Sequence, residues 1–277
     1  MKAIVFGATK SALDIIRSLK KKIDIVAFCD NDTNKIGGEI DGKPVISPDS
    51  LSSYEWDKIY IISFSAMHPI REQLLRLGIP EEKIDTSVVE YNIRARETFV
   101  ADFARLTGER NIRGAVAEVG VFQGEFAKTI NACFPESRCY LFDTFSGFDE
   151  RDVRYEKENR YSPADVGNLS GTSVELVMSK MTHADRVVIR EGFFPETAQG
   201  IDDRFVFVNL DLDLYKPTLE GLKFFYPRMV PGGITLVHDY LSKGYEGVNA
   251  AVHEFEQEHT VYPFPIADGW SIAIQKV

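Results

Sequence analysis

The sequence predicts an α/β protein in which two parallel-sheet units follow one another along the chain. Strand-like apolar runs alternate with helical apolar spacing in both halves, and this alternation is typical of parallel sheets with right-handed crossovers. The apolar run Phe205–Leu210 is followed by two carboxylates, Asp211 and Asp213. Open α/β sheets bind ligands at the carboxyl ends of their strands, so we expect a functional site in the second half.

In the first half, short apolar runs indicate strands, and apolar residues three or four apart indicate helices. Gly7 begins a turn after the first strand, Gly37–Pro44 has the composition of a hairpin, and Gly78 and Pro80 stop the last helix. The expected strands are Lys2–Phe6, Ile23–Phe28 and Ile59–Phe64, and the expected helices are Ala12–Leu19 and His68–Leu77.

The second half begins with a helical connector over Glu90–Arg110, which is rich in helix formers, and strand patterning resumes at Ala115. The expected strands are Ala115–Gly120, Arg138–Asp143, Arg186–Glu191, Phe205–Leu210, Gly233–Val237 and Trp270–Gln275. The expected helices are Gly124–Cys133, Ser173–Lys180, Lys216–Tyr226 and Tyr245–Gln257. The predicted domains are therefore a small Rossmann-like domain over 1–88, a connector over 89–112 and a larger α/β domain over 113–277.

One long segment of the second half, Ser146–Gly171, does not fit this alternation. It is highly charged and lies between a strand and a helix. Loops of this length are usually lids or binding loops, and a disordered surface insertion is the alternative.

The composition limits the partners of this chain. Among 277 residues, 42 are acidic and 32 basic, and the formal net charge of −10 argues against nucleic acid or an anionic membrane as the main partner. Cys29, Cys133 and Cys139 lack metal-type spacing, which favours reduced thiols in a cytoplasmic protein. No apolar run approaches the ~20 residues needed to span a bilayer, and no signal-type segment opens the chain.

A glycine turn follows the first strand of the second half. In Glu118–Gly124, Gly120 permits a tight turn and Gly124 permits close approach of a ligand to the backbone. Asp143 ends the next strand, about 20 residues on, at the position from which an acid binds ribose hydroxyls. The pattern indicates an adenosyl cofactor. NAD is an alternative, although the central glycine of the dinucleotide fingerprint is missing, and Glu118 suits the ammonium of a methionine tail better than a pyrophosphate.

The strand ends at Asp211 and Asp239 predict a metal site. If the two strands are neighbours, these carboxylates face each other across one strand spacing of about 5 Å. Hard oxygen ligands suit Mg²⁺. His238 either borders the site or, as a ligand, favours Mn²⁺. The alternative is that each aspartate only caps the helix that follows it.

The second half resembles the macrocin O-methyltransferase family, which methylates sugar hydroxyls, from about Gly114 to Gln275. The motifs that carry the resemblance, in order, are Glu118–Gly124, Leu141–Phe148, Gly192–Thr197, Asp211–Thr218, Tyr226-Pro227, Pro231-Gly232-Gly233 and His238–Tyr240. The resemblance implies a class I methyltransferase fold, S-adenosylmethionine as the donor, a required Mg²⁺ and a small-molecule hydroxyl acceptor, a sugar or a nucleotide-linked sugar.

The resemblance also implies roles for individual residues. Asp211, Asp239 and His238 are the candidate metal ligands, and Asp213 and Asp211 the candidate catalytic residues, with Asp213 as general base. Members of the family commonly have two adjacent acids where this chain has His238 and Asp239, and this departure leaves both Mg²⁺ and Mn²⁺ as candidates. The candidate donor-binding residues are Glu118, Gly120, Gly124, Asp143, Thr144, Phe145, Ser173, Glu191, Gly192 and Asp211.

Several assignments within this resemblance have alternatives. Ser173 is also a natural helix cap, and Phe193 and Phe194 could either flank an adenine or pack in the core. A catechol-type O-methyltransferase acting on a non-sugar hydroxyl is a further alternative, but Leu214 stands where that class has a lysine. A non-catalytic nucleotide-binding or nucleotide-sugar-binding protein is a third, which the complete set of strand-end acids disfavours.

The first half resembles the small nucleotide-binding domains joined to sugar-modifying enzymes, through its Gly7 turn and Asp30. This resemblance leaves two roles open: the domain could bind a nucleotide-sugar carrier, or it could mediate assembly. We expect the protein to form a homo-oligomer.

Overall fold

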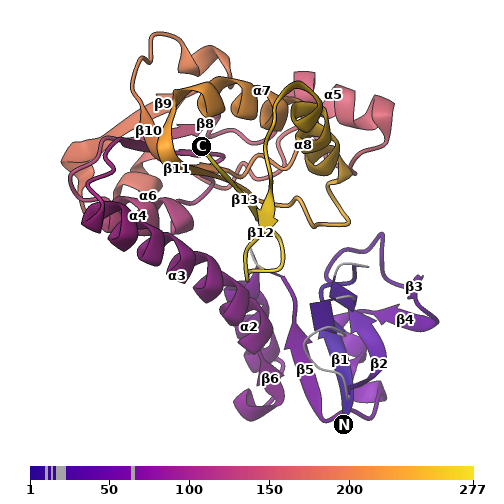
Figure 1. The fold of residues 1–277 in the computed structure, drawn as a ribbon. Helices are drawn as coiled ribbons and strands as arrows, with labels where there is room; N and C mark the ends of the chain where they lie inside the picture. Colours follow the sequence, from indigo (N-terminus) through magenta and orange to yellow (C-terminus); the bar gives the residue numbers. More distant parts are fainter. Residues whose placement is uncertain (10–11, 14, 17–22, 64–65) are drawn as a thin grey trace. The chain divides into compact units, whose positions relative to one another are not determined.

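The computed structural model describes residues 1–9, 12–13, 15–16, 23–63 and 66–277 (Figure 1). The chain forms two compact units, Met1–Arg94 and Ala95–Val277. The division falls inside α3 (Ser87–Glu109), the helix expected for the connector. The domain boundaries at residues 88 and 112 stay predictions. Within the described residues, no helix is both long and apolar enough to cross a membrane.

The first unit is built on a mostly parallel sheet with the strand order β3-β4-β2-β1-β5-β6. The expected hairpin is confirmed, because β3 and β4 pair antiparallel around a turn at Gly42. Its elements are β1 (Lys2–Phe6), β2 (Asp24–Cys29), β3 (Glu39–Ile40), β4 (Lys43–Ile46), β5 (Lys58–Ile61), α2 (Met67–Arg76) and β6 (Ile84–Asp85).

Some expectations for the first unit fall partly outside the described residues. This applies to the helix expected over Ala12–Leu19, to the turn residues Lys10 and Ser11, and to Phe64 at the end of the third expected strand. The described residues of that helix, Ala12, Leu13, Ile15 and Ile16, are helical.

The second unit is built on a seven-stranded sheet with the order β12-β13-β11-β10-β7-β8-β9. Every pairing from β11 to β9 is parallel, and β13 runs antiparallel to both of its neighbours. The strands are β7 (Ala115–Val119), β8 (Cys139–Asp143), β9 (Val187–Glu191), β10 (Phe205–Leu210), β11 (Met229–Val237), β12 (Phe264–Pro265) and β13 (Ile272–Gln275). The expected α/β, Rossmann-like class is confirmed.

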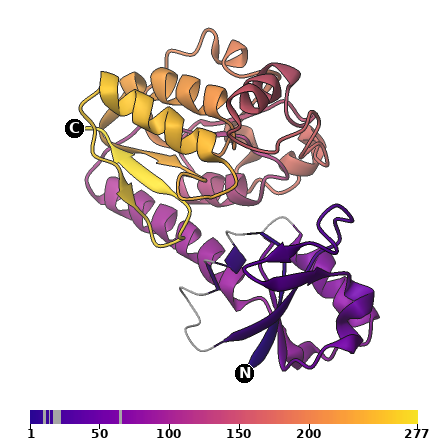
Figure 2. The ribbon, with the colours of Figure 1, turned by 90° about the vertical axis from the view of Figure 1, so that its right-hand side faces the viewer.

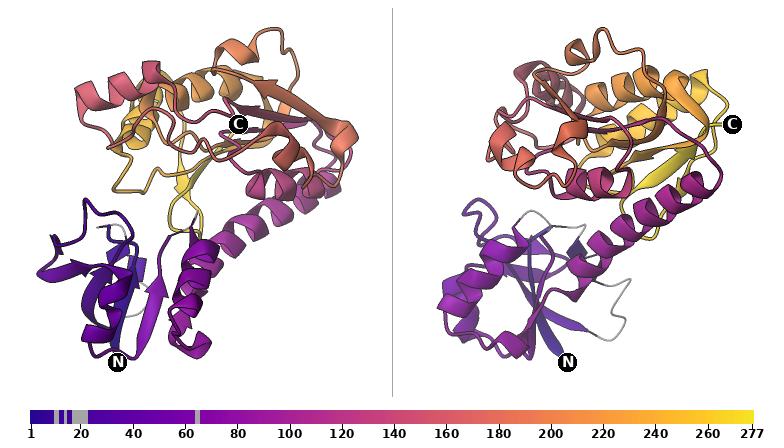
Figure 3. Two further views of the ribbon diagram at one scale, coloured as in Figure 1. Left: turned by 180° about the vertical axis from the view of Figure 1, so that it is seen from behind. Right: turned by 90° about the vertical axis from the view of Figure 1, so that its left-hand side faces the viewer.

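Helices cover both faces of this sheet (Figure 2, Figure 3). On one face, side chains of α7 and α8 pack against β7, β8 and β10 around Phe205 and Phe225. On the other face, side chains of α3, α4 and α6 pack against the same strands around Phe207. The helices are α4 (Glu125–Cys133), α5 (Glu150–Asn159), α6 (Val174–Met178), α7 (Tyr215–Phe225) and α8 (Glu246–Glu258).

The strand order fixes where a ligand can reach the sheet. From β7 the chain adds β8 and β9 on one side, and β10 and β11 then add on the other side of β7. The connections after β7 and β10 therefore leave the sheet in opposite directions, and open α/β sheets bind their ligands at such a point, at the carboxyl ends of the strands.

Two segments of this unit differ from the sequence-based expectation. The segment Ser146–Gly171 contains the helix α5, whose first turn is capped by the side chain of Asp149. The alternative of a disordered insertion is therefore wrong. β12 was not expected, because its two residues carry no readable alternation and owe their conformation to pairing with β13.

Candidate active site

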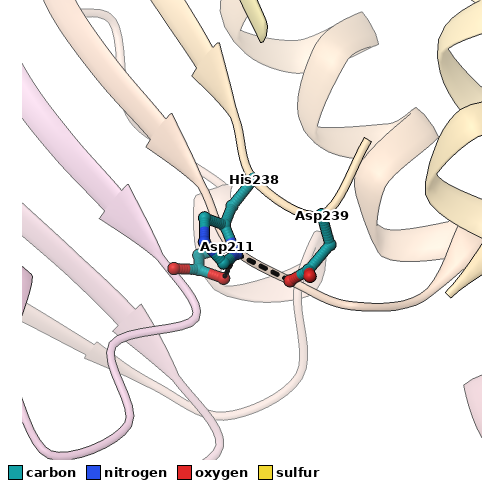
Figure 4. Close-up of side chains that lie close together, drawn as sticks. All are labelled: Asp211, His238 and Asp239. Atoms are coloured by element: carbon teal, nitrogen blue, oxygen red, sulfur yellow. Dashed lines mark hydrogen bonds and ion pairs between the residues drawn. The ribbon is translucent and has the colours of Figure 1, made fainter. Parts of the chain in front are cut away.

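Three side chains converge at the carboxyl ends of β10 and β11 (Figure 4). One ligand-type atom from each of Asp211, His238 and Asp239 lies within 4.8 Å of the others. The strands are in parallel register, with Leu210 opposite Val237, so His238 is the residue opposite Asp211. The expectation that Asp211 and Asp239 come together across one strand spacing is met, although His238 lies between them.

Asp239 reaches the cluster because the backbone leaves the extended conformation. Successive residues of a strand point to opposite faces, so His238 and Asp239 would diverge in a continuous strand. Asp239 instead has a left-handed backbone, with φ of 57°. His238 Nδ1 consequently lies 2.6 Å from Asp239 Oδ2 and 3.0 Å from Asp211 Oδ1.

The charges of this cluster balance one another. Burial lowers the pKa of His238, but the carboxylates of Asp211 and Asp239 outweigh it and raise that pKa well above its usual value. Burial raises the pKa of Asp211, but His238 and Arg96 outweigh it and hold that pKa far below its usual range. The two carboxylates thus favour the cationic form of the imidazole that lies between them.

Asp213 lies beside this cluster, as expected, but for a different reason. The strand ends at Leu210, and Asp213 has a left-handed backbone with φ of 60°, so the alternation of an extended strand does not place it. Burial, together with the charges of Asp239 and Asp211 and a side-chain hydrogen bond with Asp239, raises the pKa of Asp213 well above its usual value. These effects therefore favour the protonated form of Asp213 in the ion-free protein.

The donor set fits a divalent metal ion. Two carboxylates and one imidazole nitrogen present their atoms to one small volume, and Arg96 forms an ion pair with one of the carboxylates, that of Asp211. Oxygen ligands from Asp211 and Asp239 suit Mg²⁺, and a nitrogen ligand from His238 shifts the preference toward Mn²⁺. Neither aspartate side chain makes a cap hydrogen bond to the following helix, α7 or α8, so the capping alternative lacks support.

Arg96, on α3, was not anticipated from the sequence. Its Nη1 donates to Asp211 Oδ2 over 2.9 Å, and its guanidinium lies 4.0 Å from the centre of the Phe126 ring. Arg96 occupies the same helical stripe as the buried Val100 and Phe103, which are four and seven residues further along. A charged residue within an otherwise apolar helical stripe was the sequence signal that could have indicated Arg96.

Glu118 is buried at the next strand, β7. Its side chain is 2% exposed, and burial, with the charge of Asp211, raises its pKa to about 8. Asn209 on β10 is its cross-strand neighbour and donates to Glu118 Oε1 over 2.9 Å. Glu118 Oε2 has no hydrogen-bond partner among the described residues. A buried acid with an unused oxygen fits the ammonium group of an amino-acid tail.

The two glycines of the turn after β7 have different neighbours. A Cβ on Gly120 would lie 1.8 Å from the carbonyl oxygen of Asp211, so this glycine lets the β7 turn pass the β10 strand end. A Cβ on Gly124 would lie 3.1 Å from Val177 Cγ1 on α6. The Cβ side of Gly124 therefore approaches protein closely, and the expected contact of Gly124 with a ligand stays a prediction.

Asp143, at the end of β8, organises the same turn. Its Oδ2 accepts hydrogen bonds from the backbone N–H groups of Val121 and Phe122, both over 2.8 Å, and its Oδ1 accepts from Phe145 N–H. Thr144 donates to the carbonyl of Gly147 over 2.7 Å. These residues line the β7 and β8 strand ends, and their expected contacts with a donor stay predictions.

The remaining expected donor contacts lie farther along the same sheet edge. Glu191, paired with Asp143 in register, is exposed, and Gly192 has φ of 126°. Ser173 caps α6, accepting from Leu176 N–H, which is the structural role the sequence allowed. Phe194 is a core residue: it is 6% exposed and stacks on Phe225.

The helix α5 brings aromatic side chains to α7. Tyr155 and Tyr161 stack on Tyr215, with ring centres 5.1 and 5.4 Å from it. Lys216 Nζ lies 4.5 Å from the centre of the Tyr155 ring. Tyr215 follows Asp213 by two residues, so this aromatic group adjoins the acidic cluster along the chain.

The family models divide the chain in two. The C2185-like N-terminal model matches residues 1–85, and the macrocin-O-methyltransferase (TylF) model matches residues 90–276, about two thirds of the chain. The second match confirms the resemblance read from the motifs and the methyltransferase class.

Curated relatives agree with this family. Mycinamicin III 3″-O-methyltransferase of Micromonospora griseorubida is 27% identical over 163 residues, 54% of this chain and 63% of that enzyme. The tetracenomycin rhamnosyl 4′-O-methyltransferase of Streptomyces olivaceus is 24% identical over 196 residues, 64% of this chain and 68% of that enzyme. The match therefore spans less than two thirds of the mycinamicin enzyme's length.

Solved structures share the fold. The calicheamicin methyltransferase CalS11 superposes with a TM-score of 0.56 at 20% identity, covering 76% of this chain and 91% of its own. The O-methyltransferase NovP superposes with a TM-score of 0.54 at 20% identity, covering 66% of this chain and 80% of its own. The expected class I methyltransferase fold is confirmed, and this chain belongs to the macrocin-O-methyltransferase family.

Proposed function

We propose that this protein transfers a methyl group from S-adenosylmethionine to a hydroxyl group of a sugar or nucleotide-linked sugar, and that transfer requires a divalent metal ion. The observation that carries the proposal is that Asp211, His238 and Asp239 lie together at two strand ends, next to the strand β7 that contains Glu118. The name of the tetracenomycin relative, which specifies a rhamnosyl 4′-oxygen, supports a sugar as the acceptor.

In this proposal the ends of different strands bind different groups. Glu118 takes the ammonium of the donor with its free Oε2, and Asp143 takes ribose hydroxyls. Asp211, Asp239 and His238 hold the metal ion. When bound, S-adenosylmethionine supplies the methyl group, and the divalent ion lowers the pKa of the acceptor hydroxyl and of the Asp213 carboxyl beside it.

Asp213 acts as the general base. It accepts the hydroxyl proton while the acceptor oxygen attacks the methyl carbon and the carbon–sulfur bond breaks. The protein's further contribution is to hold the two reactants in line, which substitutes for the entropy loss of an encounter in solution. Leu214, where catechol-type enzymes have a lysine, is 1% exposed and unable to take this role.

A methyl-transfer screen tests the proposal. Purified protein is incubated with methyl-labelled S-adenosylmethionine, Mg²⁺ or Mn²⁺, and a panel of nucleotide sugars, glycosides and catechols. We expect label in a sugar-containing product with a mass increase of one methylene. Label in catechols alone would favour the catechol-type alternative, and protein that binds nucleotide sugars without transferring label would favour the non-catalytic one.

A further inference from the structure

The acidic side chains at these strand ends disfavour one of the two charged groups of the proposed donor. An amino-acid tail carries a carboxylate as well as an ammonium group, and Glu118, Asp211, Asp213 and Asp239 all place negative charge or acidic groups at these strand ends. Glu118 can pair with the ammonium, but the carboxylate needs a cation or strong hydrogen-bond donors to enter this environment.

The first turn of α4 is the usual place for an anion in this fold, but here protein side chains already occupy it. It carries its own acid, Glu125, which forms ion pairs with Lys128 over 2.6 Å and Lys180 over 2.7 Å. Lys180 also donates to the carbonyl of Gln123 in the β7 turn. The positive end of this helix is therefore compensated by protein groups.

Arg96 provides the missing charge. Its guanidinium is held between the Asp211 carboxylate and the Phe126 ring of α4, so it is fixed on the same side of the β7 turn as Asp211. Its charge is felt at Glu118, whose pKa it lowers against the larger effect of burial. Only Nη1 is engaged with a described residue, which leaves the N–H groups of Nε and Nη2 available.

We propose that Arg96 binds the α-carboxylate of the donor, so that Arg96 and Glu118 together recognise an amino-acid tail. This inference rests on the proposed function, because it names a contact to the donor of that reaction. A planar guanidinium offers two parallel N–H donors to a carboxylate, a geometry that a lysine ammonium lacks. α3 is thereby part of the binding site as well as of the core.

The test compares ligands that differ only in the tail. S-adenosylhomocysteine carries both tail charges, decarboxylated S-adenosylhomocysteine lacks the carboxylate, and 5′-methylthioadenosine lacks both. Calorimetry on the full chain measures each ligand with the wild type, Arg96→Met, Arg96→Lys and Glu118→Gln. Arg105→Met, an exposed change on the same helix, is the matched control. Thermal melting checks that each variant is folded.

We expect Arg96→Met to weaken S-adenosylhomocysteine by about 10- to 100-fold, the usual effect of losing hydrogen bonds to a charged group. The affinities of Arg96→Met for decarboxylated S-adenosylhomocysteine and 5′-methylthioadenosine should stay within about twofold of the wild type, and the affinity of Arg96→Lys for S-adenosylhomocysteine should fall between those of Arg96→Met and the wild type. Glu118→Gln should lower the affinity for both ligands that carry the ammonium group.

Three results would overturn the inference. If Arg96→Met lost the same factor of affinity for S-adenosylhomocysteine and for 5′-methylthioadenosine, Arg96 would only shape the pocket through Phe126. A loss of affinity for decarboxylated S-adenosylhomocysteine would mean that Arg96 acts through Asp211 and the ammonium. An unchanged affinity for S-adenosylhomocysteine would remove Arg96 from the site. Failure of the wild type to bind S-adenosylhomocysteine would instead reject the proposed function itself.

Discussion

At the scale of single residues, the site combines groups that are unfavourable in isolation. Glu118 is a buried acid and Asp213 a partly buried one, and the pKa values of both lie above their usual range. His238 is a partly buried imidazole whose pKa is raised. Each is unfavourable on its own because burial disfavours charge. Their grouping at strand ends is typical of a site that binds charged ligands.

Asp213 allows a direct test of the catalytic proposal. Asp213→Asn nearly preserves the shape of the side chain and removes its basicity. We expect turnover to fall by about 10²–10⁴-fold, the usual contribution of a positioned general base. Affinity for S-adenosylhomocysteine, measured by calorimetry, should be nearly unchanged. A variant that methylates at the parent rate would show that the proton leaves by another route.

Because the pKa of Glu118 is raised, we expect the stability of the donor-free, metal-free protein to depend on pH. Its pKa is about 8 in the folded chain, against 4.5 for a free side chain. Between these values the unfolded chain has lost this proton and the folded chain retains it, so rising pH favours unfolding. Glu118→Gln removes this effect, and its stability advantage over the wild type should grow from pH 5 to pH 8, reaching on the order of 3 kcal/mol at pH 7.

Denaturant unfolding at several pH values measures this advantage, with the exposed Glu220→Gln as a control. A gap between Glu118→Gln and the wild type that stays constant from pH 5 to pH 8 would contradict the account. The same variant should bind S-adenosylhomocysteine poorly, so stability and binding change in opposite directions.

The residues of the candidate metal cluster could be predicted from the sequence, but their geometry and their contact with Arg96 could not. Asp211, His238 and Asp239 could be read from strand ends because parallel strands finish at a common edge. The left-handed backbones of Asp213 and Asp239 could not be predicted from the sequence, because this conformation is uncommon for residues other than glycine. Arg96 could not be assigned either, since its partner Asp211 is 115 residues away in the chain.

At the scale of elements, the turn between β7 and α4 depends on the backbone of the neighbouring strand end. Gly120 has φ of 84°, and the carbonyl of Asp211 occupies the space that a side chain would need. The end of β7, proposed to bind the donor, and the end of β10, proposed to bind the metal ion, are therefore held together at a backbone contact. A change at Gly120 should affect both.

Gly120→Ala tests this coupling against a matched control. Gly200 also has a left-handed backbone, with φ of 77°, but no atom of the described residues lies within 4 Å of where a Cβ would stand. Both substitutions carry the cost of a left-handed alanine, about 1–2 kcal/mol, and only Gly120→Ala adds a clash. We expect its free energy of unfolding to fall by at least about 2 kcal/mol more than that of Gly200→Ala, with loss of S-adenosylhomocysteine binding. Equal losses in the two variants would contradict this coupling.

Most elements of the second unit could be predicted from periodicity, since buried strands such as Phe205–Leu210 have continuous apolar runs. α5 was missed because ERDVRYEKEN is nearly all polar. Its helix is stabilised by the Asp149 cap and by packing of Tyr155 on Tyr215, a contact between distant segments. Local sequence carries no record of such a contact.

At the scale of the whole molecule, the two units share one structural device. In the first unit Asp30, at the end of β2, accepts a hydrogen bond over 2.8 Å from Ala8 N–H in the turn after β1. In the second unit Asp143 accepts from Val121 N–H after β7 in the same way. Both sheets place the acid of their second strand beside their first turn, the arrangement that binds nucleotides in related folds.

This repetition leads to a prediction for the first unit. If residues 1–88 hold the nucleotide of a nucleotide-linked acceptor, a chain without them should show a raised KM for that acceptor and unchanged affinity for S-adenosylhomocysteine. If they mediate assembly, light scattering should instead show a change of oligomeric state. A truncated chain with the parent KM and the parent oligomeric state would leave neither role supported.

The most direct test of the account is the metal requirement of methyl transfer at the β10 and β11 strand ends. Protein stripped with EDTA should transfer no labelled methyl group, and Mg²⁺ or Mn²⁺ should restore transfer. Asp239→Asn should not be restored by either ion, because it removes a ligand from the cluster. Full transfer by the wild type in excess EDTA would contradict the central claim.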